Sequence, residues 1–76
     1  MSVYKIMLRN DEVKDFVSRA NRCDFDIDVS YNHLTVDAKS ILGVFAMDLK
    51  QILTVSCNGF NADFDRYLTS KFAAAC

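Results

Sequence analysis

The clearest alternation of apolar and polar positions lies between residues 24 and 31. Its apolar members are Phe25, Ile27, Val29 and Tyr31, and they alternate with Asp24, Asp26, Asp28 and Ser30. A period of two predicts a strand with one apolar and one acidic face. Asn32-His33 then predicts a tight turn, with residues 34–36 as the partner strand. We expect the carboxylates to line a solvated sheet face, with a metal or partner site as the less common alternative.

Two further strands and three helices are predicted along the rest of the chain. Residues 2–8 and the uncharged residues 52–57 have strand character, and the lack of charge suggests a central strand for the second. A helix is predicted over 11–22 with Asn10 as its N-cap, and a short one over 40–47. The last helix begins after Asn61, and its expected buried stripe is Phe64, Tyr67, Leu68 and Phe72.

The predicted element order is β-α-β-β-α-β-α, which defines an α+β chain. Because each helix has one apolar stripe and each strand one apolar face, two layers are expected, with helices covering one side of an antiparallel sheet. The 76 residues fit a single domain, 1–76, and 51% hydrophobic residues supply its core.

Composition excludes several classes of protein. The net charge of −1 with scattered Lys and Arg argues against nucleic acid as a partner. Cys23, Cys57 and Cys76 form no C-x-x-C pair, which excludes a disulfide scaffold or zinc site and favours a reducing cytoplasm. No apolar run is long enough to span a membrane, and no glycine-rich loop suggests a cofactor. We therefore expect a cytoplasmic chain without metal, cofactor or membrane segment.

The stretch Asp37-Ala38-Lys39-Ser40-Ile41-Leu42-Gly43-Val44 carries the strongest chemical signal. It places Ser40 where a strand should end and a short helix begin. Unpaired N–H groups and the helix dipole favour a phosphate there, although serine is also a common N-cap without further function.

This stretch resembles the segment around the regulatory serine of the HPr family, the small phosphocarriers of the bacterial sugar phosphotransferase system. Phe16-Val17 and Thr54-Val55-Ser56 fall in step with it, and the element order matches over about residues 3–75. The resemblance implies an open-faced sandwich with sheet order 1-4-2-3 and three helices on one face.

The family's phosphoryl-accepting histidine has no counterpart in this chain. Counting back from Phe16-Val17 puts Arg9 near the histidine position and Asp11 near that of the family's arginine. Carboxylates at a helix start repel a phosphoryl group, and arginine stays protonated, so we expect no catalytic residue and no enzyme activity. His33 is expected to be an exposed turn residue, far from the start of the first helix.

The resemblance assigns the remaining roles to the segment around Ser40. Ser40 would be phosphorylated by a serine kinase/phosphorylase, beside Lys39. Leu42, Phe45 and Arg9 would dock protein partners, such as a transcriptional regulator of carbon catabolite repression or phosphotransferase-system components. Leu42 and Phe45 could instead belong to the core.

Three functional hypotheses follow. The first is a non-catalytic regulatory module with a phosphorylatable serine. The alternatives are a phosphocarrier with an atypical acceptor such as His33, and a small-molecule binding domain of the same shape.

Overall fold

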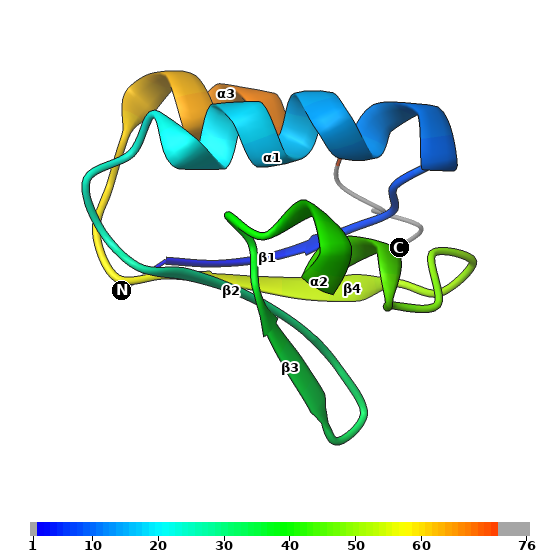
Figure 1. The fold of residues 1–76 in the computed structure, drawn as a ribbon. Coiled ribbons are helices and arrows are strands. Elements are labelled where there is room, and N and C mark those ends of the chain that lie inside the picture. Colours follow the sequence, from blue (N-terminus) through cyan, green and yellow to red (C-terminus); the bar gives the residue numbers. More distant parts are fainter. Residues whose placement is uncertain (1, 72–76) are drawn as a thin grey trace.

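A four-stranded antiparallel sheet forms one layer of the molecule. The computed structural model describes residues 2–71, and its strands follow the order β1-β4-β2-β3 (Figure 1). Their bounds are β1 Ser2–Ile6, β2 Ile27–Tyr31, β3 Leu34–Asp37 and β4 Leu53–Cys57. The antiparallel two-layer architecture and the sheet order are as predicted, and the uncharged strand is central, because β4 pairs with β1 on one side and β2 on the other.

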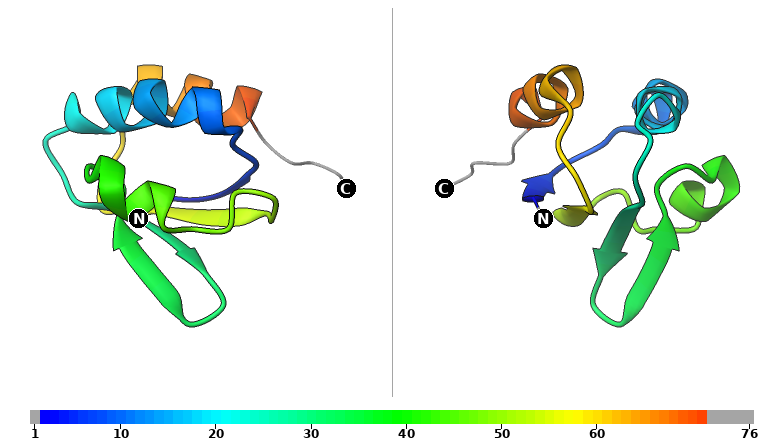
Figure 2. Two further views of the ribbon diagram at one scale, coloured as in Figure 1. Left: turned by 45° about the vertical axis from the view of Figure 1, so that its right-hand side comes forward. Right: turned by 90° about the vertical axis from the view of Figure 1, so that its left-hand side faces the viewer.

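The helices cover one face of this sheet. They are α1 Val13–Asn21, α2 Ile41–Phe45 and α3 Ala62–Ser70, and a 3-10 turn, η1 Asn10–Glu12, precedes α1. Figure 2 shows α1 and α3 side by side above the sheet, with α2 lower beside them and the β2–β3 hairpin projecting away from the helices. The chain directions of α1 and α3 are opposite, so the end of α1 lies beside the start of α3 (Figure 1).

The core fills the space between the two layers. Its largest fully buried side chains are Phe16, Ile6, Ile27, Leu53, Leu68, Val13, Val29, Val44 and Val55. The predicted stripes of the long helices face this core, with Phe16 of α1 packed against Phe64 of α3 at 6.0 Å between ring centroids. Phe72, assigned to the same stripe, lies outside the described residues.

The acidic strand face is shorter than predicted. Because β2 begins at Ile27, Asp24 and Asp26 precede the strand and only Asp28 belongs to it, although all three are exposed. The segment is shaped by a distant contact: Phe25 packs on Gly59, where an added Cβ would lie 2.5 Å from Phe25 Cδ2. Beside it, the Asn58 N–H donates to the Asp26 carbonyl at 2.8 Å.

The start of the first helix also differs from the prediction. Asn10 is not its N-cap; it opens the 3-10 turn, and Arg9 takes the flanking position. The Glu12 carboxylate accepts from the Arg9 N–H at 2.9 Å, and the Glu12 N–H donates to the Arg9 carbonyl at 2.9 Å. These reciprocal bonds fix a tight turn, so α1 begins at Val13.

Candidate functional site

Ser40 is the residue directly before α2, as the sequence predicts. Its exposed Oγ accepts a hydrogen bond from the Gly43 N–H at 3.1 Å, which makes it the N-cap. Asp37 prepares this position, because its carboxylate accepts from the Lys39 N–H at 2.9 Å and its carbonyl from the Ser40 N–H at 3.0 Å. Asp37 thus holds the loop, a role that an Asx turn performs and that the sequence analysis did not assign.

Lys39 faces the end of α1. Its Nζ donates to the Cys23 carbonyl at 2.9 Å, and its own carbonyl accepts from Asn21 Nδ2 at 3.1 Å. The ammonium group is therefore engaged by the main chain after α1.

Leu42 and Phe45 project from α2 into solvent. Leu42 is 80% exposed and Phe45 46%, whereas Val44 of the same helix is fully buried. Of the two alternatives, core or surface, both side chains take the surface. The exposed Leu42 and Phe45 side chains form an apolar patch on α2, next to Ser40.

The start of α1 is occupied by the chain's own ion pairs. Arg9 forms a two-pronged contact with Asp11, at 2.9 Å from Nη2 and 3.2 Å from Nε, and this contact lowers the pKa of Asp11. Glu12 is paired with Lys71, whose hydrogen bond lowers the pKa of Glu12, helped by the Arg9 N–H. The start of α1 thus presents two carboxylates, each already paired with a cation.

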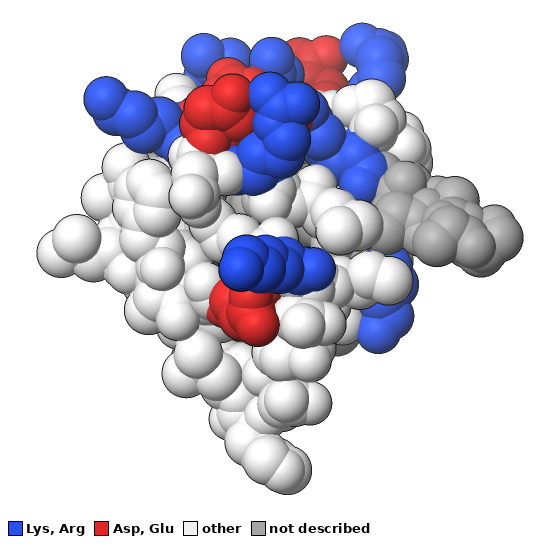
Figure 3. All heavy atoms as spheres, turned by 90° about the vertical axis from the view of Figure 1, so that its right-hand side faces the viewer, with Lys and Arg blue, Asp and Glu red and all other residues white. Residues whose placement is uncertain are grey.

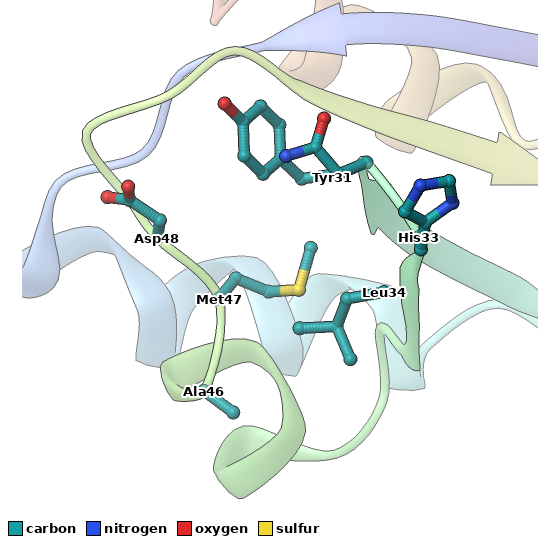
Figure 4. Close-up of a pocket in the computed structure, with 7 residues that line it drawn as sticks. Tyr31, His33, Leu34, Ala46, Met47 and Asp48 are labelled. Carbon is teal, nitrogen blue, oxygen red and sulfur yellow. The ribbon is translucent and has the colours of Figure 1, made fainter.

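His33 lies at the exposed tip of the β2–β3 hairpin, as predicted, after Asn32 at a φ of 55°. A hollow of about 490 Å³ lies beside it, and Figure 4 shows Leu34 and Met47 pointing toward one another there. Its lining consists of Tyr31, Asn32, His33, Leu34, Ala46, Met47 and Asp48. No Lys or Arg lines this hollow.

On the face shown in Figure 3, many of the Lys, Arg, Asp and Glu side chains gather at the helix end of the molecule. Further basic and acidic side chains lie near the middle of this face, and its projecting hairpin end is uncharged.

The described cysteines are poor nucleophiles. Cys23 and Cys57 are buried free thiols, and burial raises the pKa of Cys57 to about 11 and also raises that of Cys23. Cys76 lies outside the described residues. Within residues 2–71, no three His, Cys, Asp or Glu side chains cluster as metal ligands would, and no helix there is both long and apolar enough to cross a bilayer.

The sheet order, the three covering helices and the serine-capped α2 define an open-faced β-sandwich of the HPr type. No protein-family model matches the sequence, and no curated protein matches it significantly. Several solved structures do match the fold, and two of them are HPr proteins.

The first is HPr-C-His from Thermoanaerobacter tengcongensis, with a TM-score of 0.73 and 23% identity over 96% of this chain and 97% of that one. The second is the phosphocarrier protein HPr from Bacillus anthracis strain Ames, with a TM-score of 0.69 and 24% identity over 93% of each chain. These similarities confirm the predicted HPr fold.

Proposed function

We propose that this chain is a non-catalytic HPr-like module related to the phosphotransferase system, which docks a protein partner through α2 and is regulated by phosphorylation of Ser40. The observation that carries the proposal is the exposed Ser40 hydroxyl at the first turn of α2, next to the exposed Leu42. A phosphate there would meet the N–H groups of the helix start and add negative charge beside the apolar patch.

The start of α1 supports the non-catalytic part of the proposal. Transfer through a histidine requires a neutral imidazole and positive groups that hold the phosphate. Arg9 cannot act as the nucleophile, and its guanidinium is engaged by Asp11. Although paired with Asp11, Arg9 is exposed before the start of α1, where a partner could contact it.

The proposal is tested by incubating the chain with an HPr serine kinase/phosphorylase and ATP and measuring the intact mass. We expect the mass of one phosphoryl group on the wild type and none on Ser40→Ala. Ser18→Ala, which removes an exposed hydroxyl from α1, is the matched control and should keep the gain. An equal gain in Ser40→Ala, or no gain in the wild type, would remove the switch.

Docking is tested separately on the unphosphorylated and phosphorylated chain. The partner used is a transcriptional regulator of carbon catabolite repression. Leu42→Asp should weaken its binding at least tenfold, because the substitution places a charge in the apolar patch. Val3→Asp changes an exposed apolar residue of β1 and should leave binding unchanged. Equal affinity of both variants would contradict docking through α2.

The hollow beside His33 makes a small-molecule binding domain the second candidate, because Leu34 and Met47 offer an apolar surface there. The same hollow disfavours His33 as a phosphoryl acceptor, because its lining offers Asp48 and no cation. Phosphoenolpyruvate with the first enzyme of the system should give no acid-labile adduct. An adduct that His33→Ala abolishes would reverse this choice.

A further inference from the structure

A groove between α1 and α3 gathers three arginines. Its volume is about 360 Å³, and a smaller hollow of about 60 Å³ shares Arg19, Arg22 and Asp63 with it and continues to Asn61 at the start of α3. The groove lining consists of Arg19, Arg22, Asp63, Arg66, Tyr67 and Ser70. Three guanidinium groups and one carboxylate give this lining a formal charge of +2, in a chain whose net charge is −1.

The ion pairs around the groove leave much of this hydrogen-bonding capacity unused. Arg19 uses Nε to contact Asp15 at 3.0 Å, and Arg66 reaches Asp63 only at 3.5 Å. Within the described part of the chain, the Arg22 side chain has no ion-pair or hydrogen-bond partner. Each guanidinium carries five donors, so most of them remain directed to solvent or to a ligand.

Helix electrostatics explain only part of this arrangement. Cations in the last turn of a helix complement its dipole, which accounts for Arg19 and Arg22 at the end of α1. Arg66 lies in the middle of α3, where the dipole gives no such reason, and the packing of the two antiparallel helices brings it to the same groove.

Tyr67 provides an independent observation in the lining. It is 8% exposed, the Arg19 guanidinium lies 4.4 Å from its ring centroid, and its buried hydroxyl has no hydrogen-bond partner within residues 2–71. The ring therefore holds the Arg19 guanidinium at the groove through a cation–π contact.

We infer that the α1–α3 groove binds a small oxyanion, of which phosphate and its monoesters are common members. Guanidinium groups form charge-assisted pairs with such oxygens. The three arginines exceed the two carboxylates that contact them, Asp15 and Asp63, by one positive charge. The first turn of α3 adds little to the site, because it carries the carboxylates of Asp63 and Asp65 and the Asn61 side chain already caps the Phe64 N–H. This site is separate from Ser40 and does not depend on its phosphorylation.

The test is an NMR titration of the full chain with inorganic phosphate and, in a second arm, glycerol 3-phosphate, each against sodium chloride at equal ionic strength. We expect saturable shifts at the amides of residues 19–22 and 61–63 and at the arginine Nε–H groups. Tighter binding of glycerol 3-phosphate would assign the site to monoesters, and tighter binding of phosphate to the free ion.

Arg22→Gln and Arg66→Gln should each weaken this binding about fivefold, since each removes a charge-assisted contact. Lys14→Gln makes the same change of charge on α1 outside the groove and should alter affinity less than twofold. Unsaturable shifts, or equal affinity of both arginine variants and the lysine control, would overturn the inference. Amide dispersion in each spectrum reports whether the variant is folded.

Discussion

The hydroxyl groups of Tyr4 and Tyr67 lie in different environments. Tyr4 donates its hydroxyl to Asp65, whereas the Tyr67 hydroxyl is buried without a partner among residues 2–71. Burial is the largest cause that raises the pKa of each to about 12, so both stay protonated at neutral pH. The two hydroxyls should therefore contribute to stability with opposite sign.

The paired variants Tyr4→Phe and Tyr67→Phe test this contrast. We expect Tyr4→Phe to lower the free energy of unfolding by about 1 kcal/mol, because a hydrogen bond to a carboxylate is lost. Tyr67→Phe should leave it unchanged or raise it by up to about 1 kcal/mol, because an unpaired hydroxyl is removed. Urea denaturation measures the free energy of unfolding of both variants and the wild type. A larger decrease for Tyr67→Phe than for Tyr4→Phe would show that the Tyr67 hydroxyl is hydrogen-bonded in solution.

The local sequence was sufficient to predict the position of Ser40, but it could not predict the contact made by its neighbour Lys39. An N-cap depends on the three residues that follow, so the bond from the Gly43 N–H could be anticipated. The contact of Lys39 with the Cys23 carbonyl joins residues 16 apart, and no local pattern encodes it. No local pattern predicts the position of Arg66 either. It lines the same groove as Arg19 and Arg22 only because α1 and α3 pack together.

Between elements, the pair of Glu12 and Lys71 joins the turn before α1 to the residue after α3. Lys71 lowers the pKa of Glu12 below its ordinary value of 4.5. A lowered folded-state pKa gives stability that is present above the unfolded pKa and is lost as the pH falls through the folded value.

Glu12→Gln should therefore destabilise the protein by about 1 kcal/mol near neutral pH. The difference from the wild type should shrink as the pH falls below about 4.5, where the wild-type carboxylate takes up its proton. Thermal or urea unfolding of both proteins between neutral and acidic pH measures this difference in the free energy of unfolding. Asp11→Asn, in a fully exposed pair, should show a smaller effect, and a pH-independent difference for Glu12→Gln would contradict the pairing.

The contact between Phe25 and Gly59 joins the segment before β2 to the turn after β4. Gly59→Ala places a methyl group 2.5 Å from Phe25 Cδ2 and should destabilise the protein by about 1–3 kcal/mol. In Phe25→Ala the same glycine substitution should cost much less, because the obstructing ring is gone. Additive costs in this double-mutant cycle would show that the ring and the turn do not meet.

The predicted bounds of an element are right where a repeating apolar pattern defines them. They are wrong at the start of β2, where the contact between Phe25 and Gly59 lies. The stripe of Val13, Phe16 and Val17 was readable because it repeats at helical spacing. The strand predicted from residue 24 begins only at Ile27, because Phe25 turns toward Gly59, which is 34 positions away in the sequence. Alternation alone could not reveal that the apolar residue packs outside the sheet.

For the whole molecule, the sheet order sets a gradient of stability. The strand β4 is paired on both sides, whereas β3 pairs only with β2 and belongs to the hairpin that projects from the helical layer (Figure 2). A doubly paired strand opens only in global unfolding, whereas an edge strand can open locally.

Hydrogen exchange measures this gradient. We expect the amides of Leu53–Cys57 that are bonded within the sheet to exchange with the free energy of global unfolding, and those of Leu34–Asp37 to exchange faster through local opening. Exchange should be followed amide by amide at constant pH. Equal protection of β3 and β4 would contradict an independent hairpin.

The crowded entrance to α1 also bears on re-engineering the chain as a phosphoryl carrier. Installing an imidazole by Arg9→His would remove the partner of Asp11 and leave that carboxylate beside the new nucleophile, with Glu12 still held by Lys71. A gain of transfer chemistry therefore requires at least the joint replacement of both acids by neutral or basic residues. The single substitution Arg9→His should therefore give no phosphoryl transfer, although the backbone scaffold is in place.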